Sequence, residues 1–134
     1  MNGISFLFLV KPDVTISKTT TSFDGQGRQS INIPCSYVSN PAATSVFWTK
    51  FNAVAGTGSG NSKVIVIDGE KYQGGSLNSP SLTIYNLQNS DEGSYRCSAA
   101  NIIGQGDSNY VTLNVDTNGE FDKSRLIVFG KLYI

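Results

Sequence analysis

Apolar and polar residues alternate along most of this chain with the two-residue period of β-strands, and the 3.6-residue period of an amphipathic helix is absent. Seven segments are predicted as strands: 14–16, 29–38, 44–50, 63–67, 81–87, 93–100 and 110–115. They are separated by Gly, Ser, Asn and Thr, which are the residues of turns. This pattern predicts an all-β sandwich.

The alternation also assigns one face of each strand to the interior. The expected buried residues are Ile31, Ile33, Cys35, Tyr37, Val46, Trp48, Leu82, Ile84, Tyr95, Cys97, Ala99, Val111, Leu113 and Val115. Pro34 interrupts the second strand, and because proline has no N–H to donate, a bulge or an unpaired amide is expected there. A further short strand is expected near Tyr72, although the pair Gly74-Gly75 weakens the signal.

Residues 53–62 form a run of small residues that is predicted to be a loop after the third strand. Within it, Gly56-x-Gly58-x-Gly60 is similar to a phosphate-binding loop. That loop ends in Gly-Lys-Ser/Thr and joins a strand to a helix, and this segment does neither. We therefore interpret it as a flexible connection.

The composition excludes several kinds of chemistry. The chain has 134 residues, which fits one domain, and ten Lys plus Arg balance ten Asp plus Glu. A nucleic-acid partner is not expected, because no basic stripe is present. The absence of histidine excludes Ser-His-Asp and Cys-His catalysis and every imidazole zinc site. The acids Asp91 and Glu92, or Asp68 and Glu70, lack the regular spacing of a calcium loop. We expect no enzyme activity, no cofactor and no metal.

The predicted domain covers residues 12–116, with an N-terminal extension at 1–11 and a linker and tail at 117–134. The apolar run at 4–10 is either a short secretory signal or coding sequence that belongs to an upstream segment. The tail at 126–134 is too short to span a membrane, which takes about 20 apolar residues. The first strand of a following module would also produce such a tail.

Two cysteines surround the single tryptophan. Trp48 follows Cys35 by 13 residues, and Cys97 follows Cys35 by 62. The cysteines either form a disulfide in an oxidising compartment or are two buried thiols. Tyr95 stands two residues before Cys97, which is the place of a tyrosine corner, and Leu82 lies upstream in the fifth strand.

The residues before and after the second cysteine follow a recognisable motif, which consists of Asp91, Gly93, Tyr95 and Cys97, and then Ala99, Asn101 and Gly104. Asp-x-Gly-x-Tyr-x-Cys followed by Ala-x-Asn-x-x-Gly resembles the intermediate (I-set) type of the immunoglobulin superfamily over roughly residues 12–116. The resemblance implies a Greek-key sandwich of two antiparallel sheets, with a Cys35–Cys97 disulfide packed against Trp48. The small-residue segment 53–62 departs from the I-set pattern and is closer to the variable type.

One sheet face is a candidate binding surface. If the third, sixth and seventh strands pair side by side, one surface holds Phe47, Thr49, Arg96, Ser98, Tyr110 and Thr112. Aromatic residues and arginine are enriched at interfaces, although an ordinary sheet face carries scattered aromatics as well. The turn that contains Ile102 and Ile103 is a second candidate, and we expect one isoleucine to fold back onto the sandwich.

These observations predict an extracellular protein-binding module for adhesion or recognition, either secreted or part of a membrane protein. Its partner is expected to be a protein, in homophilic or heterophilic contact. The alternatives are a structural module of an intracellular filament and a ligand-binding piece of a receptor ectodomain. A fold of this kind hosts many functions and does not choose among them.

Overall fold

The computed structural model describes residues 9–54, 56–115, 126–128 and 131–133. Their elements are β1 (Val10–Ile16), β2 (Thr20–Phe23), β3 (Gln29–Ile33), β4 (Cys35–Asn40), β5 (Ser45–Val54), β6 (Ser59–Val64), β7 (Tyr72–Gly74), β8 (Leu82–Ile84), the 3-10 helix η1 (Asn89–Asp91), β9 (Gly93–Ala100), β10 (Gln105–Asp107), β11 (Val111–Val115), β12 (Leu126–Val128) and β13 (Lys131–Tyr133). The all-β prediction is confirmed. Among the described residues, none belongs to a helix long and apolar enough to cross a membrane.

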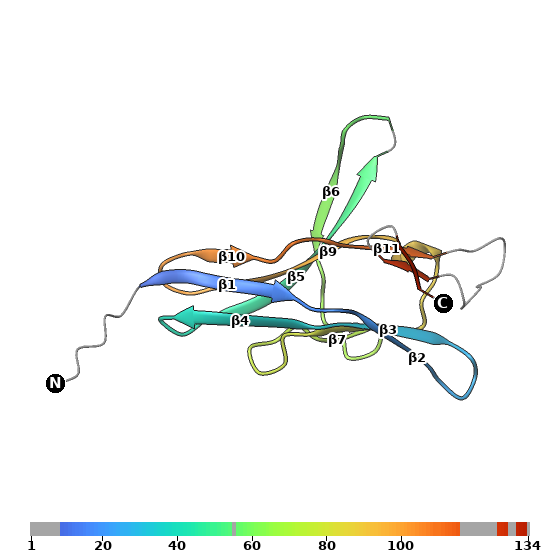
Figure 1. Ribbon diagram of the computed structural model, residues 1–134, viewed down its shortest axis with the longest axis horizontal. Coiled ribbons are helices and arrows are strands. Elements are labelled where there is room, and N and C mark those ends of the chain that lie inside the picture. Colours follow the sequence, from blue (N-terminus) through green and yellow to red (C-terminus); the bar gives the residue numbers. More distant parts are fainter. Residues whose placement is uncertain (1–8, 55, 116–125, 129–130, 134) are drawn as a thin grey trace.

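The strands form two layers that face each other (Figure 1). One sheet has the order β13-β12-β11-β9-β5-β6, with β10 also paired to β9, and the other has the order β2-β3-β8-β7. β1 pairs with β4 at one side of the sandwich and lies against β10. A Cβ atom on Gly106 of β10 would lie 1.7 Å from the Pro12 carbonyl oxygen, so a larger residue there would push β1 away. The antiparallel two-layer sandwich predicted from the sequence is confirmed.

Pro34 divides the predicted second strand into β3 and β4, which have different partners. β3 pairs with β2 and β8, whereas β4 pairs with β1. The Pro34 carbonyl still accepts a hydrogen bond from the Ser17 amide at 3.1 Å. The missing N–H of proline is thus accommodated where the chain passes from one set of partners to the other.

The largest difference from the sequence prediction concerns residues 53–62, which form most of a hairpin and not a loop. β5 and β6 pair from Thr49↔Val64 to Val54↔Ser59, and the hairpin projects away from the sandwich (Figure 1). Gly56 and Gly58 have φ of 77° and 68°, and such positive values suit glycine in a tight turn. The predicted strand 63–67 is therefore shifted: β6 ends at Val64, and only the Ile65 amide continues the pairing, to the Trp48 carbonyl at 2.9 Å.

The short elements β2, β10 and η1 were not predicted, and a strand in the tail was considered only as the first strand of a following module. β12 pairs with β11, and β13 pairs with β12, so strands from the predicted tail extend the larger sheet. The expected short strand near Tyr72 is confirmed by β7. Residues 1–8 of the predicted N-terminal extension and 116–125 of the predicted linker lie outside the described residues.

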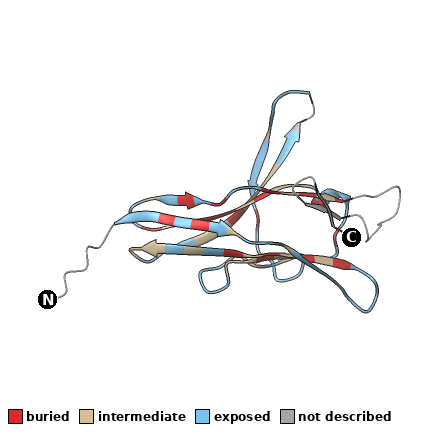
Figure 2. Cartoon of the chain, in the orientation of Figure 1, coloured by how far each residue is buried: buried red, intermediate tan, exposed pale blue. Residues whose placement is uncertain are grey.

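The core lies between the two sheets, where the buried residues gather (Figure 2). Trp48 and the sheet residues Ile31, Ile33, Leu82, Ile84 and Leu113 are each at most 1% exposed. Of the predicted interior residues, only Tyr37 and Val46 are partly exposed, and both still pack against this core. The two-residue alternation therefore identified the interior of the sandwich.

Candidate recognition surface

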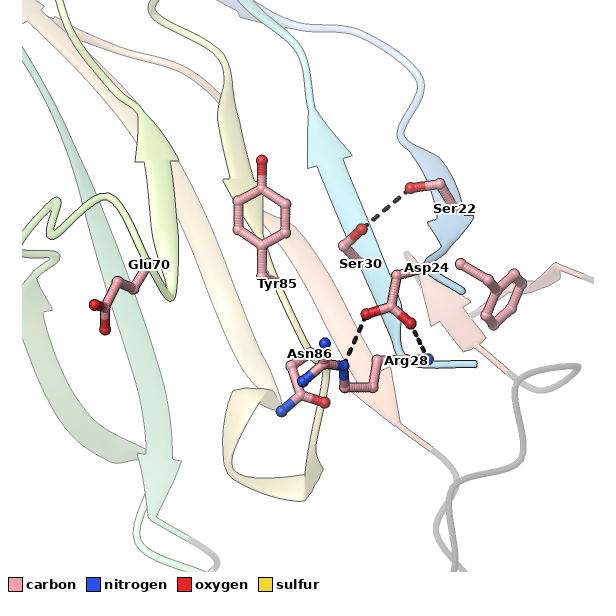
Figure 3. Close-up of a pocket in the computed structure, with 8 residues that line it drawn as sticks. Ser22, Asp24, Arg28, Ser30, Glu70, Tyr85 and Asn86 are labelled. Atoms are coloured by element: carbon pink, nitrogen blue, oxygen red, sulfur yellow. Dashed lines mark hydrogen bonds and ion pairs between the residues drawn. The ribbon is translucent and has the colours of Figure 1, made fainter. Parts of the chain in front are cut away.

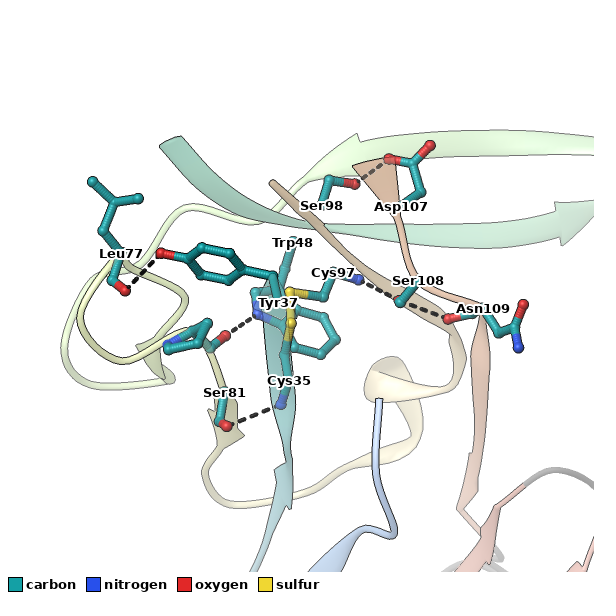
Figure 4. The surroundings of a disulfide bond; sticks show 11 residues. Cys35, Tyr37, Trp48, Leu77, Ser81, Cys97, Ser98, Asp107, Ser108 and Asn109 are labelled. Carbon is teal, nitrogen blue, oxygen red and sulfur yellow. Dashed lines mark hydrogen bonds between the residues drawn. A yellow bond between two sulfur atoms is a disulfide. The ribbon is translucent and has the colours of Figure 1, made fainter. Parts of the chain in front are cut away.

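The scaffold of the candidate site is the link between the sheets. Cys35 and Cys97 form the predicted disulfide, and Trp48 lies opposite Cys97 in the β5–β9 pairing (Figure 4). The indole N–H of Trp48 donates to the Pro80 carbonyl at 2.7 Å, which satisfies the only polar atom of a side chain that is 1% exposed. β5 and β9 are thereby fixed against the opposite sheet.

The start of β9 is held by a tyrosine and a buried carboxylate. The Tyr95 hydroxyl donates to the Asp91 carbonyl at 2.6 Å, and burial raises the pKa of Tyr95 far above its ordinary value. The Asp91 carboxylate accepts from Lys71 Nζ and from the Gln88 amide, both at 2.7 Å. Gly93 has a φ of 152°, a conformation that residues with side chains rarely adopt. These contacts fix the point at which β9 enters the sheet.

The strand pairing brings most of the predicted surface residues together. Thr49 lies opposite Arg96, and Phe47 lies opposite Ser98, in the β5–β9 ladder. Thr112 lies opposite Ser94 in the β11–β9 ladder, and the hydroxyls of these two residues are 3.0 Å apart. Because Trp48 and Cys97 point into the core, their sequence neighbours on the same strands point out. One continuous sheet face results.

The centre of this face is an aromatic–arginine cluster, formed by Phe51, Arg96 and Tyr110. The Arg96 guanidinium carbon lies 4.4 Å from the centre of the Tyr110 ring. The Phe51 and Tyr110 ring centres are 6.4 Å apart with an interplanar angle of 53°. The sequence prediction missed Phe51 because it ended the third strand at residue 50. Continuing the alternation from Phe47 through Thr49 would have found it.

Ser98 belongs to this face by strand direction but offers no surface, because it is 1% exposed. Its hydroxyl donates to Asp107 Oδ1 at 2.6 Å, and Asp107 is exposed in its place. Partial burial raises the pKa of Asp107, but hydrogen bonds from Ser98 and Gln105 and the nearby positive charge of Arg96 outweigh that effect, so the pKa lies below its ordinary value. A carboxylate therefore borders the cluster.

Ile102 and Ile103 lie at the β9–β10 turn, and the expectation that one of them folds back is wrong. The two residues are 84% and 48% exposed. The buried side chain of Asn101 occupies the inner side of the turn, where its Oδ1 accepts from the Ile103 and Gly104 amides. Its Nδ2 donates to the Val10 carbonyl at 2.8 Å. The inward position is therefore filled by a polar side chain, and both isoleucines face solvent.

The structure does not support the acidic pairs or the glycine-rich segment as ligand sites. Among the described residues, no group of three or more His, Cys, Asp or Glu side chains could hold a metal ion. Asp91 forms an ion pair with Lys71, while Glu92 accepts a hydrogen bond from the Val115 amide at 2.9 Å. The segment with Gly56 and Gly58 is the turn of the β5–β6 hairpin, so the context of a phosphate loop, a strand followed by a helix, is absent from it.

Comparison with curated proteins gives relatives that are named as cell adhesion molecules. Cell adhesion molecule 1 of Homo sapiens is 30% identical over 103 residues, which cover 75% of this chain and 20% of the relative. Cell adhesion molecule 1 of Mus musculus is also 30% identical over 103 residues, which cover 75% of this chain and 19% of that relative. The chain thus spans about a fifth of the length of these two relatives.

Among solved structures, the full ectodomain (Ig1-Ig3) of mouse nectin-like molecule 4 matches with a TM-score of 0.53. The match covers 84% of this chain and 32% of that chain at 20% identity, so it shows a shared fold only. The sequence profile of the immunoglobulin domain family matches residues 11–101, which is more than half of the chain. On this match, the chain belongs to the immunoglobulin domain family.

Proposed function

We propose that this chain is an extracellular protein-recognition module that binds its partner through the outward face of β5, β9 and β11. The observation that carries the proposal is the aromatic–arginine cluster. Tyr and Arg are among the residues that contribute most to binding at protein interfaces, especially at the centre of a patch. Tyr110 is 37% exposed and directly precedes β11, while Arg96 lies within β9.

The cluster is also organised before any partner arrives. Stacking on Tyr110 restricts the Arg96 side chain, so less conformational entropy is lost on binding than for a free arginine. The Asp107 carboxylate interacts electrostatically with this cation, and Thr49 lies opposite Arg96 in the β5–β9 ladder. Because the whole chain has a formal net charge of zero, we expect short-range complementarity, and not long-range attraction, to dominate binding.

The extracellular part of the proposal is supported by the Cys35–Cys97 disulfide, because such bonds persist in oxidising compartments. The same bond argues against the intracellular filament alternative. The curated relatives are named as cell adhesion molecules, which supports adhesion as the setting. A titration of free thiols in protein from its native source checks this point, and two titratable thiols would favour the filament.

The test uses the full chain, biotinylated and displayed on fluorescent beads. Bead–bead aggregation reports homophilic binding, and attachment to intact cells reports a different partner. We expect one of these, and we expect Arg96→Ala or Tyr110→Ala to weaken it at least about tenfold. Thr83→Ala, on the opposite sheet, is the matched control and should bind like the wild type. Equal binding by all variants, or none by the wild type in either format, contradicts the proposal.

A further inference from the structure

The outward face of the opposite sheet has a different chemistry. Its uncharged hydrogen-bonding side chains are paired across neighbouring strands. The pairs are Ser22 with Ser30 at 3.1 Å, Asn32 with Thr83 at 2.8 Å, and Tyr85 with Gln73 at 2.9 Å. Near one end, between the β2–β3 turn and residues 70–86, this face is hollowed by a cavity of about 450 Å³ (Figure 3). That volume lies within the range of small-molecule sites, which is roughly 300–1,000 Å³.

One wall of the hollow is an arginine that is already held in place. Arg28 Nε donates to Asp24 Oδ2 at 2.7 Å. Asp24 Oδ1 accepts from the Gln26 and Arg28 amides at 2.8 and 2.9 Å. The hydrogen bond from the Arg28 amide, followed by that from its side chain, holds the pKa of Asp24 below its ordinary value. Because Arg28 Nε donates to Asp24, the two terminal amino groups of Arg28 are the donors that are left for a ligand.

The second wall of the hollow is the side-chain amide of Asn86, whose backbone conformation is fixed. Asn86 has a φ of 52°, which is uncommon for a residue other than glycine but tolerated by asparagine. The backbone carbonyl of Asn86 accepts a hydrogen bond from Lys71 Nζ at 3.0 Å, which holds the residue in place. The side-chain amide, which offers both a donor and an acceptor, lines the hollow together with Arg28 (Figure 3).

The third wall is an aromatic ring. Tyr85 is 36% exposed, and its hydroxyl is directed to Gln73 Oε1 at 2.9 Å. The ring therefore keeps one orientation, with an apolar face beside the polar groups of Arg28, Asn86 and Ser30 (Figure 3). A flat apolar face next to fixed donors and acceptors suits a ligand that has C–H groups on one side and hydroxyls on its edges.

The charges around the hollow narrow the class of ligand. Arg28 is balanced by Asp24, and Glu70 adds a second carboxylate to the lining. With Arg28 and Asp24 balanced, Glu70 gives the lining one net negative charge, which disfavours a phosphate, a sulfate or an acidic sugar, while a lipid would leave the polar lining unpaired. We propose that the hollow binds a neutral saccharide, which stacks on Tyr85 and hydrogen-bonds with Arg28, Asn86 and Ser30. This site is on the sheet opposite the recognition face and does not depend on it.

The experiment is a ¹⁵N NMR titration of the full chain with the methyl glycosides of glucose, galactose, mannose and N-acetylglucosamine. We expect at least one of them to give saturable shift changes at the Ser30, Tyr85 and Asn86 amides. The ligand efficiency of drug-sized molecules, applied to a methyl hexoside, gives a dissociation constant of about 1 mM. A methyl glucuronide is the charged comparison and should bind more weakly.

Substitutions distinguish the contribution of the Tyr85 ring to binding from that of the Asn86 amide. Tyr85→Ala should weaken binding at least about tenfold, whereas Tyr85→Phe, which keeps the ring but loses the hydrogen bond to Gln73, should weaken it only severalfold. Asn86→Gly suits the positive φ, so it should remain folded while binding severalfold more weakly. Tyr110→Ala, which tests the other face, should leave the titration unchanged. The proposal is overturned if no neutral glycoside shifts these amides, if the glucuronide binds more tightly, or if Tyr85→Ala binds like the wild type.

Discussion

Replacing Lys71 by Met should destabilise the fold more than replacing its partner Asp91 by Asn, although both changes remove the same ion pair. The reason is that the two partners are buried to different degrees. The Asp91 side chain is 3% exposed, and the Lys71 side chain is 31% exposed. The ammonium group donates to the carbonyls of Tyr85 and Asn86 as well as to Asp91. Each substitution leaves a different group behind, and the environment of that group sets the cost.

In Lys71→Met, the Asp91 carboxylate stays buried and keeps the Gln88 amide, but loses its cation. Breaking a buried pair in this way costs about 3–5 kcal/mol when both partners are enclosed. Because Lys71 is partly exposed and water reaches its side of the pair, we expect about 2–3 kcal/mol. In Asp91→Asn, the amide oxygen still accepts from Gln88, and Lys71 keeps two carbonyls and solvent. We expect a cost of about 1 kcal/mol.

Urea unfolding at neutral pH, followed by the fluorescence of Trp48, the only tryptophan, measures both costs. Lys63→Met, at an exposed lysine, is the matched control and should change the free energy of unfolding by no more than about 0.5 kcal/mol. The double variant should be less destabilised than the sum of the single changes, since the buried charge is gone. If Asp91→Asn costs as much as Lys71→Met, the uncompensated carboxylate does not set the cost of breaking this pair, and the reasoning is refuted.

Two further predictions concern the disulfide and the dependence of folding stability on pH below about 4. Replacing both Cys35 and Cys97 by Ala opens a 62-residue loop, which should cost about 4 kcal/mol and lower the urea midpoint by about 2 M. Wild type reduced with dithiothreitol should then unfold at the same midpoint, and a clear mismatch would contradict the loop-closure argument. Asp107 has a folded pKa below its unfolded value of 3.8, so its contribution is present above that pH and is lost as the pH falls through the folded pKa. Ser98→Ala should therefore reduce the loss of stability on acidification and raise the Asp107 pKa measured by NMR, and an unchanged pKa would contradict this role of the hydrogen bond.

The interior of the sandwich was predictable from the sequence because burial imposes a strict rule. A strand with one covered face must place apolar residues at every second position, and a shift of one residue would expose them. Trp48, Tyr95 and Cys97 therefore appear in the pattern on the correct side. The break at Pro34 was predictable for a similar reason, since a missing N–H has a fixed consequence for pairing. The change of strand partner that this break allows depends on contacts from distant residues.

The elements that were missed lie where this rule does not apply. The β5–β6 hairpin projects from the sandwich, so most of its described side chains are exposed on both faces and no alternation is required. β10 has a three-residue span whose middle residue is Gly106, which carries no side chain to reveal the pattern. The outward turn of both isoleucines depends on Asn101 and its bonds to distant segments such as Val10. Hydrophobic periodicity contains none of this information.

The two sheet faces show why the fold was easier to predict than the function. Sequence alternation marks a residue as outward, but it does not say which strands lie beside it. Phe51, Arg96 and Tyr110 become one cluster only because β9 lies between β5 and β11. Tyr85, Arg28 and Asn86 meet only because the β2–β3 turn lies beside the end of β8. Since two packed sheets are separated by a core about 10 Å thick, a substitution on one outward face should leave the other intact. Loss of protein binding and loss of saccharide binding can therefore be separated within one folded domain.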